Sequence, residues 1–114
     1  MTSITTALIA KALDGLQARQ AATAQNIANA NSESYRPIRV TFEESLRAAA
    51  SGGLTAIAGV TPQTELAPTP KIASEMRLDL EIANASQTAL RYGALLSVLE
   101  GRGAMMRAVV NGGR

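Results

Sequence analysis

Two adjacent carboxylates, Glu43 and Glu44, are the residues of this chain that come closest to catalytic chemistry. An acid and a base must both reach one substrate, whereas neighbouring residues on a helix point in different directions. The 114-residue chain has no His and no Cys, which removes zinc sites and most pairs of a nucleophile with its base. Neither Gly-Gly pair is followed by Lys-Ser or Lys-Thr in the spacing of a phosphate loop. The sequence therefore predicts no enzyme, no metal site and no cofactor.

A second group of polar residues lies between positions 26 and 35, where the chain reads Asn-Ile-Ala-Asn-Ala-Asn-Ser-Glu-Ser-Tyr. Asn26, Asn29 and Asn31 are mediocre helix formers, and their amides can bond nearby backbone groups. Asparagine also tolerates the left-handed conformation at a helix C-cap. The ordinary interpretation of such a segment is the frayed end of a helix.

The element that carries this segment is a helix predicted over residues 3–31. Apolar positions recur there at alternating steps of four and three residues, which is the spacing of a heptad seam. The seam consists of Ile9, Leu13, Leu16, Gln20, Thr23, Ile27 and Ala30. Gln20 and Thr23 weaken it, and Gly15 costs about 1 kcal/mol relative to Ala inside a helix. This helix is expected to need a packing partner.

A longer helix is predicted over residues 74–110, with the same spacing sustained for more heptads. Its seam consists of Leu78, Ile82, Ala85, Ala89, Tyr92, Leu96, Leu99, Gly103, Met106 and Val110. A second partial stripe is formed by Leu95, Val98, Met105 and Val109. One partner helix covers only one stripe, so the second stripe indicates contacts with further helices or with neighbouring subunits, the alternative being ordinary hairpin core.

The middle of the chain is predicted to hold a short helix over residues 41–50, started by a capping box in which Thr41 precedes Glu44 by three positions. Residues 51–74 contain glycines and prolines among small side chains and are predicted to be an irregular or disordered loop, with a β-hairpin around 54–60 as the alternative. A loop of this length in a compact domain suggests an element that acts in assembly.

The fold class that follows is all-α: two long terminal helices form a coiled-coil hairpin, with a short third helix and the loose middle loop, in one domain spanning residues 1–114. Aromatic residues make up 3% of the chain, so alanine and leucine must supply the core through close helix packing. The net charge is +2 with interspersed charges, which gives no footprint for nucleic acid. The start of the chain lacks the pattern of a secretory signal peptide, and no apolar stretch reaches membrane-spanning length.

The asparagine segment resembles the N-terminal motif of the bacterial flagellar axial proteins, which form the rod and hook. That motif runs Asn-hydrophobic-Ala-Asn, two variable residues, then Thr-Pro-Gly-Tyr. The residues that match this motif are Asn26, Ile27, Ala28, Asn29 and Tyr35. In place of Thr-Pro-Gly the chain has Ser32-Glu33-Ser34. Residues 12–20 resemble the same family, as does the C-terminal pattern of Leu78, Asp79, Leu80 and Glu81 followed by Asn84 and residues 89–92.

This resemblance implies a single rod-type domain. The short chain has no room for the inserted domains of hook and distal-rod subunits, so it is similar to proximal rod subunits. Among these, the pattern of Leu78, Asp79 and Glu81 followed by residues 89–92 resembles the FlgB type. The implied partners are copies of itself, other rod proteins, the rod–MS-ring adaptor and the MS ring. The implied location is the periplasmic rod of the basal body, reached through the flagellar type III export apparatus without a cleaved signal peptide. No nucleic acid or small-molecule substrate is expected.

The resemblance implies roles for three side chains near residue 30, and helix geometry suggests roles for the others. Asn26 and Asn29 would fix the helix end through amide hydrogen bonds, and Tyr35 would dock against an adjoining helix or subunit. Asp79 and Glu81 would favour the dipole at the start of the last helix, or simply lie in solvent. Tyr92, Leu96 and Leu99 would form the seam, either within the hairpin or between subunits.

Two other classes of protein fit the same pattern. An inner-rod or needle subunit of a type III secretion system would also be a helical hairpin without a signal peptide, although residues 26–29 argue against it. A soluble helical adaptor or chaperone could bind a partner helix through the exposed stripe. For a rod subunit, by contrast with these two classes, the expected assembly is a helical filament or tube. Subunits form one when they meet head to tail without closing a ring.

Overall fold

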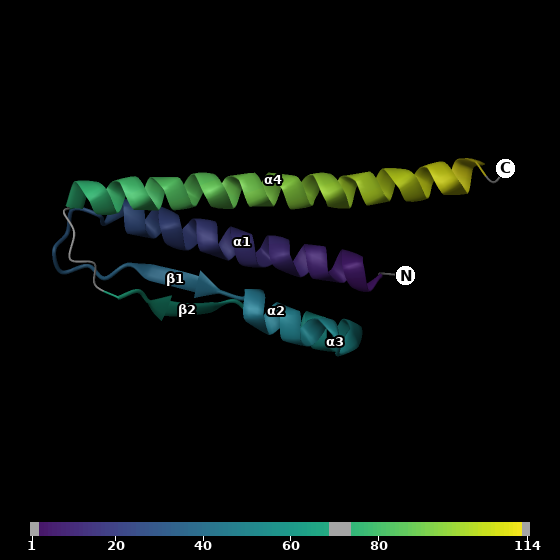
Figure 1. Cartoon of the computed structure of the whole chain (residues 1–114), viewed down its shortest axis with the longest axis horizontal. Helices are drawn as coiled ribbons and strands as arrows, with labels where there is room; N and C mark the ends of the chain where they lie inside the picture. The colour runs from purple at the N-terminus through teal and green to yellow at the C-terminus, as the bar shows by residue number, and fades with distance from the viewer. Residues whose placement is uncertain (1–2, 69–73, 113–114) are drawn as a thin grey trace.

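The fold is dominated by two long helices from the two ends of the chain, which lie antiparallel and in contact (Figure 1). A computed structural model describes residues 3–68 and 74–112. Helix α1 spans Ile4–Ala28, and helix α4 spans Ser74–Gly112. The molecule is 63 Å long and only 26 Å and 15 Å across. The predicted hairpin of two long helices is therefore confirmed.

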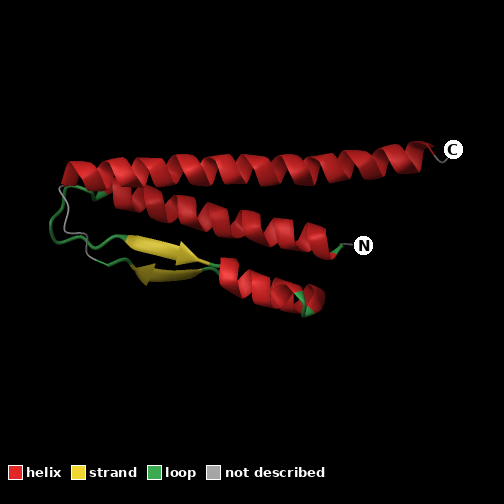
Figure 2. Ribbon diagram, in the orientation of Figure 1, coloured by secondary structure: helices red, strands yellow, loops and turns green. Residues whose placement is uncertain are grey.

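The middle of the chain forms a second layer, which packs chiefly against α1 (Figure 2). Strand β1 (Ile38–Thr41) pairs antiparallel with strand β2 (Gln63–Leu66), in a register that sets Ile38 opposite Leu66. Between the strands lie two short helices, α2 (Glu43–Ala50) and α3 (Gly53–Ala58). Helix α1 is thus the central element, because it contacts α4 as well as β1, α2 and α3.

The structure differs from the predicted loop over residues 51–74. Residues 53–58 form a helix and residues 63–66 form a strand, so the alternative of a hairpin around 54–60 is also wrong. Gly53 makes the tight connection from α2 to α3 because its φ of +86° is readily adopted only by glycine. Residues 69–73 of the predicted loop lie outside the described residues.

The helix ends also differ in detail from the prediction. Ser3 caps α1, with its hydroxyl oxygen accepting from the Thr6 amide at 3.1 Å. Thr41 belongs to β1, and its hydroxyl donates to Glu65 across the strand pair instead of capping α2, so the predicted capping box is wrong. The pairing of β1 with β2 uses the Thr41 side chain that a cap would need.

The deepest core lies between α1 and the middle layer. It consists of Leu16, Ala22, Val40, Phe42, Leu46, Ile57 and Val60, with Tyr92 and Leu95 of α4 packed at its margin. Gly15 is required there because a Cβ atom at this position would lie 2.5 Å from the Phe42 ring. The aromatic ring thus packs directly on the backbone of α1, which explains a glycine in the middle of a helix.

The row of α4 that faces α1 is rotated relative to the predicted seam. Ala85, Tyr92 and Leu99 lie on it as predicted, but Ile82 is 49% exposed and Thr88, at 4%, is buried. Two hydrogen bonds from α1 accompany this rotation: Gln20 donates to the Ala85 carbonyl oxygen at 3.3 Å, and Asn26 donates to Glu81.

Candidate functional site

The side chain of Asn26 connects three elements near the end of α1. Its amide nitrogen donates to the Ile38 carbonyl oxygen at 2.9 Å and to a Glu81 carboxylate oxygen at 3.2 Å. Its amide oxygen accepts from the Tyr35 hydroxyl at 2.8 Å and from the Ile38 amide at 2.9 Å. We call this group of four residues the Asn26 junction.

The junction uses the full hydrogen-bonding capacity of a buried amide. An asparagine side chain offers two donors and two acceptor lone pairs, and all four are paired here. Asn26 is only 4% exposed, so each lost partner would leave a desolvated polar atom unpaired. The amide therefore fixes both the start of β1 and the position of α4 against the end of α1.

The predicted motif residues at this end have unequal structural roles. Asn29 bonds only within its own helix end, where its amide donates to the Gln25 carbonyl oxygen at 2.8 Å. Its φ of −111° is not left-handed. Ile27 is half-buried and Ala28 is exposed. The Tyr35 hydroxyl donates to Asn26 across the turn, so this aromatic residue contacts α1 of the same chain.

The predicted residues of α4 also separate into two groups. Glu81 joins the Asn26 junction, while Asp79 is exposed to solvent. Asp79 lies beyond the first turn of α4, and the acidic residue in that first turn is Glu75. The expectation that Glu81 serves the helix dipole is therefore wrong, because the described helix begins at Ser74. The four apolar members Leu78, Tyr92, Leu96 and Leu99 are all partly buried along α4.

A second polar cluster, centred on Arg19 and Glu43, was not predicted as a site. Arg19 donates to both oxygens of Glu43 at 2.7 Å and 2.6 Å and twice to the Val40 carbonyl oxygen. Its guanidinium carbon lies 4.8 Å from the centre of the Phe42 ring. Hydrogen bonds from Arg19 lower the pKa of the Glu43 carboxyl from 4.5 to about 2. A carboxylate held ionised by an arginine suits a structural tie better than proton transfer.

Glu43 and Glu44 do not act as a pair in this structure. Glu43 faces Arg19, with Arg91 of α4 at 3.9 Å, whereas Glu44 pairs with Arg47 of the same helix at 3.4 Å. A polar groove of about 280 Å³ lies between α1, β1 and α4, and its lining includes Arg19, Arg39, Arg91 and Glu81. Within residues 3–68 and 74–112, no three acidic side chains come together in an arrangement that could hold a metal ion.

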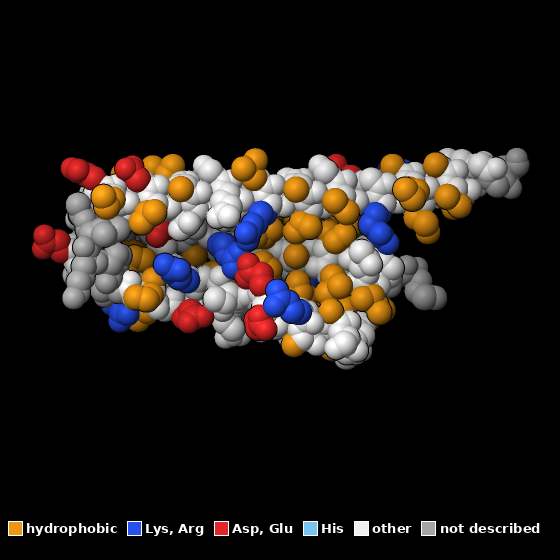
Figure 3. Space-filling model, viewed as in Figure 1, with side chains coloured by type: hydrophobic (Ala, Val, Ile, Leu, Met, Phe, Trp, Pro, Cys, Tyr) orange, Lys and Arg blue, Asp and Glu red, His pale blue; other side chains and the backbone are white. Residues whose placement is uncertain are grey.

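The outer surface of α4 carries large hydrophobic side chains along its whole length. The exposed ones are Met76, Leu80, Ile82, Leu90, Val98, Met105, Met106, Val109 and Val110. The helix continues past the start of α1, so residues 104–112, which we call the protruding end, are all exposed (Figure 1). Figure 3 shows hydrophobic side chains gathered on this projection. Such an apolar surface marks a site of interaction with a protein or a membrane.

None of the described helices is both long enough and apolar enough to cross a membrane. The apolar surface of α4 is interrupted by charged residues such as Arg91, Glu100 and Arg107.

Comparison with known proteins finds neither a family model nor a curated protein that matches this chain.

Proposed function

We propose that this chain is a structural subunit of the bacterial flagellar basal-body rod, of the proximal FlgB type. In this role it polymerises through its terminal helices and helps to form the shaft between the MS ring and the distal rod and hook. The observation that carries the proposal is the unpartnered apolar surface of α4, which α1 covers on one side only. A subunit with such a surface gains a complete core when it packs among copies and related subunits.

The Asn26 junction favours a rod subunit over other helical assemblies. Asn26 and Tyr35 belong to the N-terminal motif, and Glu81 belongs to the C-terminal motif. All three meet at one hydrogen-bonded point. The two motifs that resemble the axial proteins therefore depend on each other structurally, which a chance similarity at two distant places would not require.

The proposed partners follow from this role. They are copies of the chain, other rod proteins, the rod–MS-ring adaptor and the MS ring, after export through the flagellar type III apparatus. The middle layer gives the subunit a folded body in addition to its helices. Assembly therefore needs no ordering of residues 53–58 and 63–66, which already form α3 and β2.

The test is electron microscopy of basal bodies from cells that lack the gene. We expect MS rings without a rod above them, and restored rods when the intact gene is returned. A matched pair of returned variants sharpens the result: Asn26→Ala should fail to restore rods, and Asn29→Ala should restore them, because only Asn26 joins three elements. Intact rods and hooks in the deleted cells would rule out this function and leave the secretion-needle and adaptor hypotheses.

A further inference from the structure

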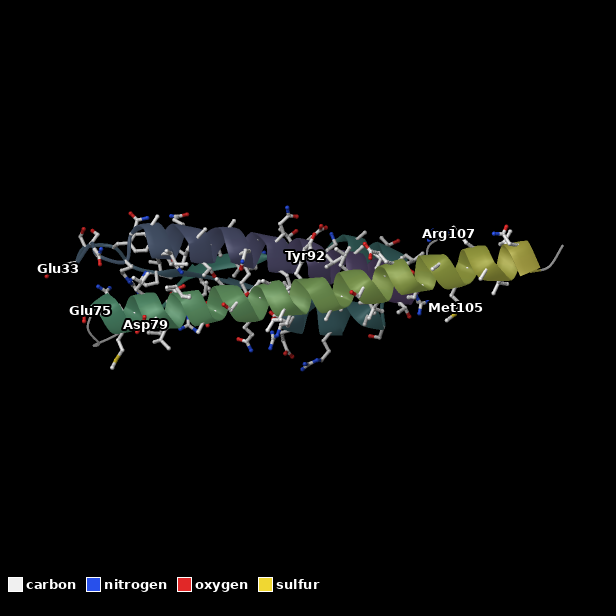
Figure 4. The ribbon with its side chains drawn as sticks, turned by 90° about the horizontal axis from the view of Figure 1, so that it is seen from above. Glu33, Glu75, Asp79, Tyr92, Met105 and Arg107 are labelled. Carbon is white, nitrogen blue, oxygen red and sulfur yellow. The ribbon has the colours of Figure 1, made fainter. Side chains whose placement is uncertain are left out.

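The two ends of the molecule carry opposite charges. From Gly101 to Gly112, α4 contains Arg102 and Arg107 and no carboxylate, the preceding one being Glu100. The opposite end, which we call the acidic end, consists of the turn at residues 29–35 and the first two turns of α4. Glu33, Glu75 and Asp79 are all exposed there. Figure 4 shows these three residues at one end of the molecule, far from Arg107.

Basic residues at the acidic end do not cancel this asymmetry. Arg36 donates to the Ala67 carbonyl oxygen at 3.1 Å, and Arg77 donates to the Ala30 carbonyl oxygen at 3.3 Å. Both guanidinium groups keep their positive charge, and Arg36 is exposed, as are Glu33, Glu75 and Asp79. The described residues 29–37 and 74–81 nevertheless contain four carboxylates, those of Glu33, Glu75, Asp79 and Glu81, against these two arginines, which leaves a net charge of −2.

Both ends also carry apolar side chains. Met105, Met106, Val109 and Val110 are 61–68% exposed on the protruding end. Met76 and Leu80 are 57% and 55% exposed on the acidic end, next to the carboxylates of Glu75 and Asp79. The protruding end extends about 13 Å at 1.5 Å per residue, which leaves a step between it and the start of α1. A partner with a blunt, acidic and partly apolar end would fill that step.

We propose that this partner is a second copy of the chain, and that the protruding end of one copy docks on the acidic end of the next. Met105, Met106, Val109 and Val110 then lose contact with water against Met76, Leu80 and the turn at residues 29–35. Arg102 and Arg107 lie beside Glu33, Glu75 and Asp79. The contact joins two different surfaces, so it repeats in one direction and gives a polar row of subunits. This inference rests on the proposed assembly through the terminal helices and adds which surfaces meet.

Site-specific cross-linking tests the contact directly, because the chain has no cysteine. One preparation carries Ala108→Cys and another carries Met76→Cys, which leaves every charge in place. When the purified full-length chains are mixed with a short bis-maleimide, we expect a cross-linked dimer. Either preparation alone should give little, and Ala48→Cys, exposed on α2, serves as the control partner. Absence of the mixed product at high protein concentration, or an equal yield from Ala108→Cys alone, would overturn the proposal.

Charge reversal provides the second measurement. Added to Ala108→Cys, Arg107→Glu should lower the initial cross-linking rate by about fivefold to tenfold, and Glu75→Arg added to Met76→Cys should do the same. The two reversed partners mixed together should recover most of that rate. Arg47→Glu and Glu44→Arg, both on exposed α2 side chains, should leave it unchanged. If reversals on α2 lowered the rate equally, the contact would be non-specific and the proposal would fail.

The outcome is separable from that of the function test. Rods that depend on the gene in cells, together with no cross-link between positions 108 and 76, would retain the rod assignment and discard this contact. A cross-link between positions 108 and 76 in the purified chains, together with rods that form without the gene, would retain this contact and discard the rod assignment.

Discussion

The hydroxyl group of Tyr35 donates to the side-chain oxygen of Asn26 at 2.8 Å, across a turn that separates the two residues by nine positions. This bond holds the turn against the end of α1 just before β1 begins. Because the same asparagine also holds Ile38 and Glu81, the turn, the strand and α4 share one anchor.

Asn26→Ala is expected to lower the free energy of unfolding by about 3 kcal/mol. The substitution leaves the Ile38 amide and carbonyl without their partner at a buried position, and an unpaired buried polar group costs about 1–3 kcal/mol. Asn29→Ala is the matched control, with an expected cost below about 1 kcal/mol, because it removes one exposed bond within α1. Urea denaturation followed by circular dichroism measures both, and equal losses would contradict a special role for Asn26.

Tyr35→Phe is expected to cost about 1 kcal/mol, because it removes one hydrogen bond and keeps the ring. The effect should largely disappear when Asn26→Ala is already present, since the acceptor is then gone. A double-mutant cycle measured by the same denaturation gives the coupling between the two side chains. Additive losses would mean that the Tyr35 hydroxyl is stabilised by something other than Asn26.

Gly15→Ala is expected to destabilise the fold by about 1–3 kcal/mol, even though alanine is the better helix former. The new methyl group would lie 2.5 Å from the Phe42 ring, which must then shift. Gly93→Ala, in α4, has no atom within 4 Å of the added Cβ and should stabilise the chain by about 0.5–1 kcal/mol. Thermal melts of the two variants should therefore move in opposite directions.

The Arg19–Glu43 ion pair predicts a pH dependence of stability. The pKa of Glu43 is lowered to about 2 in the folded chain, so between about pH 5 and pH 2 the unfolded chain binds more protons at this carboxyl. The contribution of the pair is present above pH 5 and is lost as the pH falls toward 2. Because the Glu43 side chain is 48% exposed, we expect a loss of only about 1 kcal/mol.

Glu43→Gln should flatten that part of the stability curve when unfolding is measured across pH 2–7. Glu44→Gln, at the neighbouring exposed position, should retain it. An unchanged acid limb in Glu43→Gln would assign the dependence to other carboxylates.

Met106→Gln combined with Val110→Thr tests the protruding end separately from the fold. Both side chains are more than 60% exposed, so the free energy of unfolding should change by less than about 0.5 kcal/mol. Rod formation in complemented cells should nevertheless be lost, because these side chains become buried only on assembly. Rods of normal number and length would show that this end is not a contact surface.

The two long helices were predictable because their apolar residues repeat at helical spacing over many turns. The rotation of α4 was not, because it depends on single bonds such as Gln20 to the Ala85 carbonyl across 65 positions. The strand pair was missed for a different reason. The Gln63–Leu66 strand is exposed throughout and lies between prolines, so it lacks the alternation by which a half-buried strand is recognised.

The candidate site was partly visible in the sequence. Asn26 and Tyr35 were selected because they match the family motif, without a prediction that they bond each other, and Glu81 was selected for its position near a helix start. Arg19 and Glu43 were missed as a pair because nothing local connects residues 24 positions apart. Gly15 offered a usable signal, since a glycine that interrupts a helix often marks a close packing contact such as the one with Phe42.

The protruding end of α4 also bears on how long an unassembled copy survives. Residues 104–112 have no other described element to cover them, so their backbone amides should exchange with solvent far faster than those opposite α1. We therefore expect a protease to cut a free copy at Arg107 before it cuts the rest of α4. Free copies would then be trimmed at their tips while docked copies are shielded, so turnover would remove the copies that have not assembled.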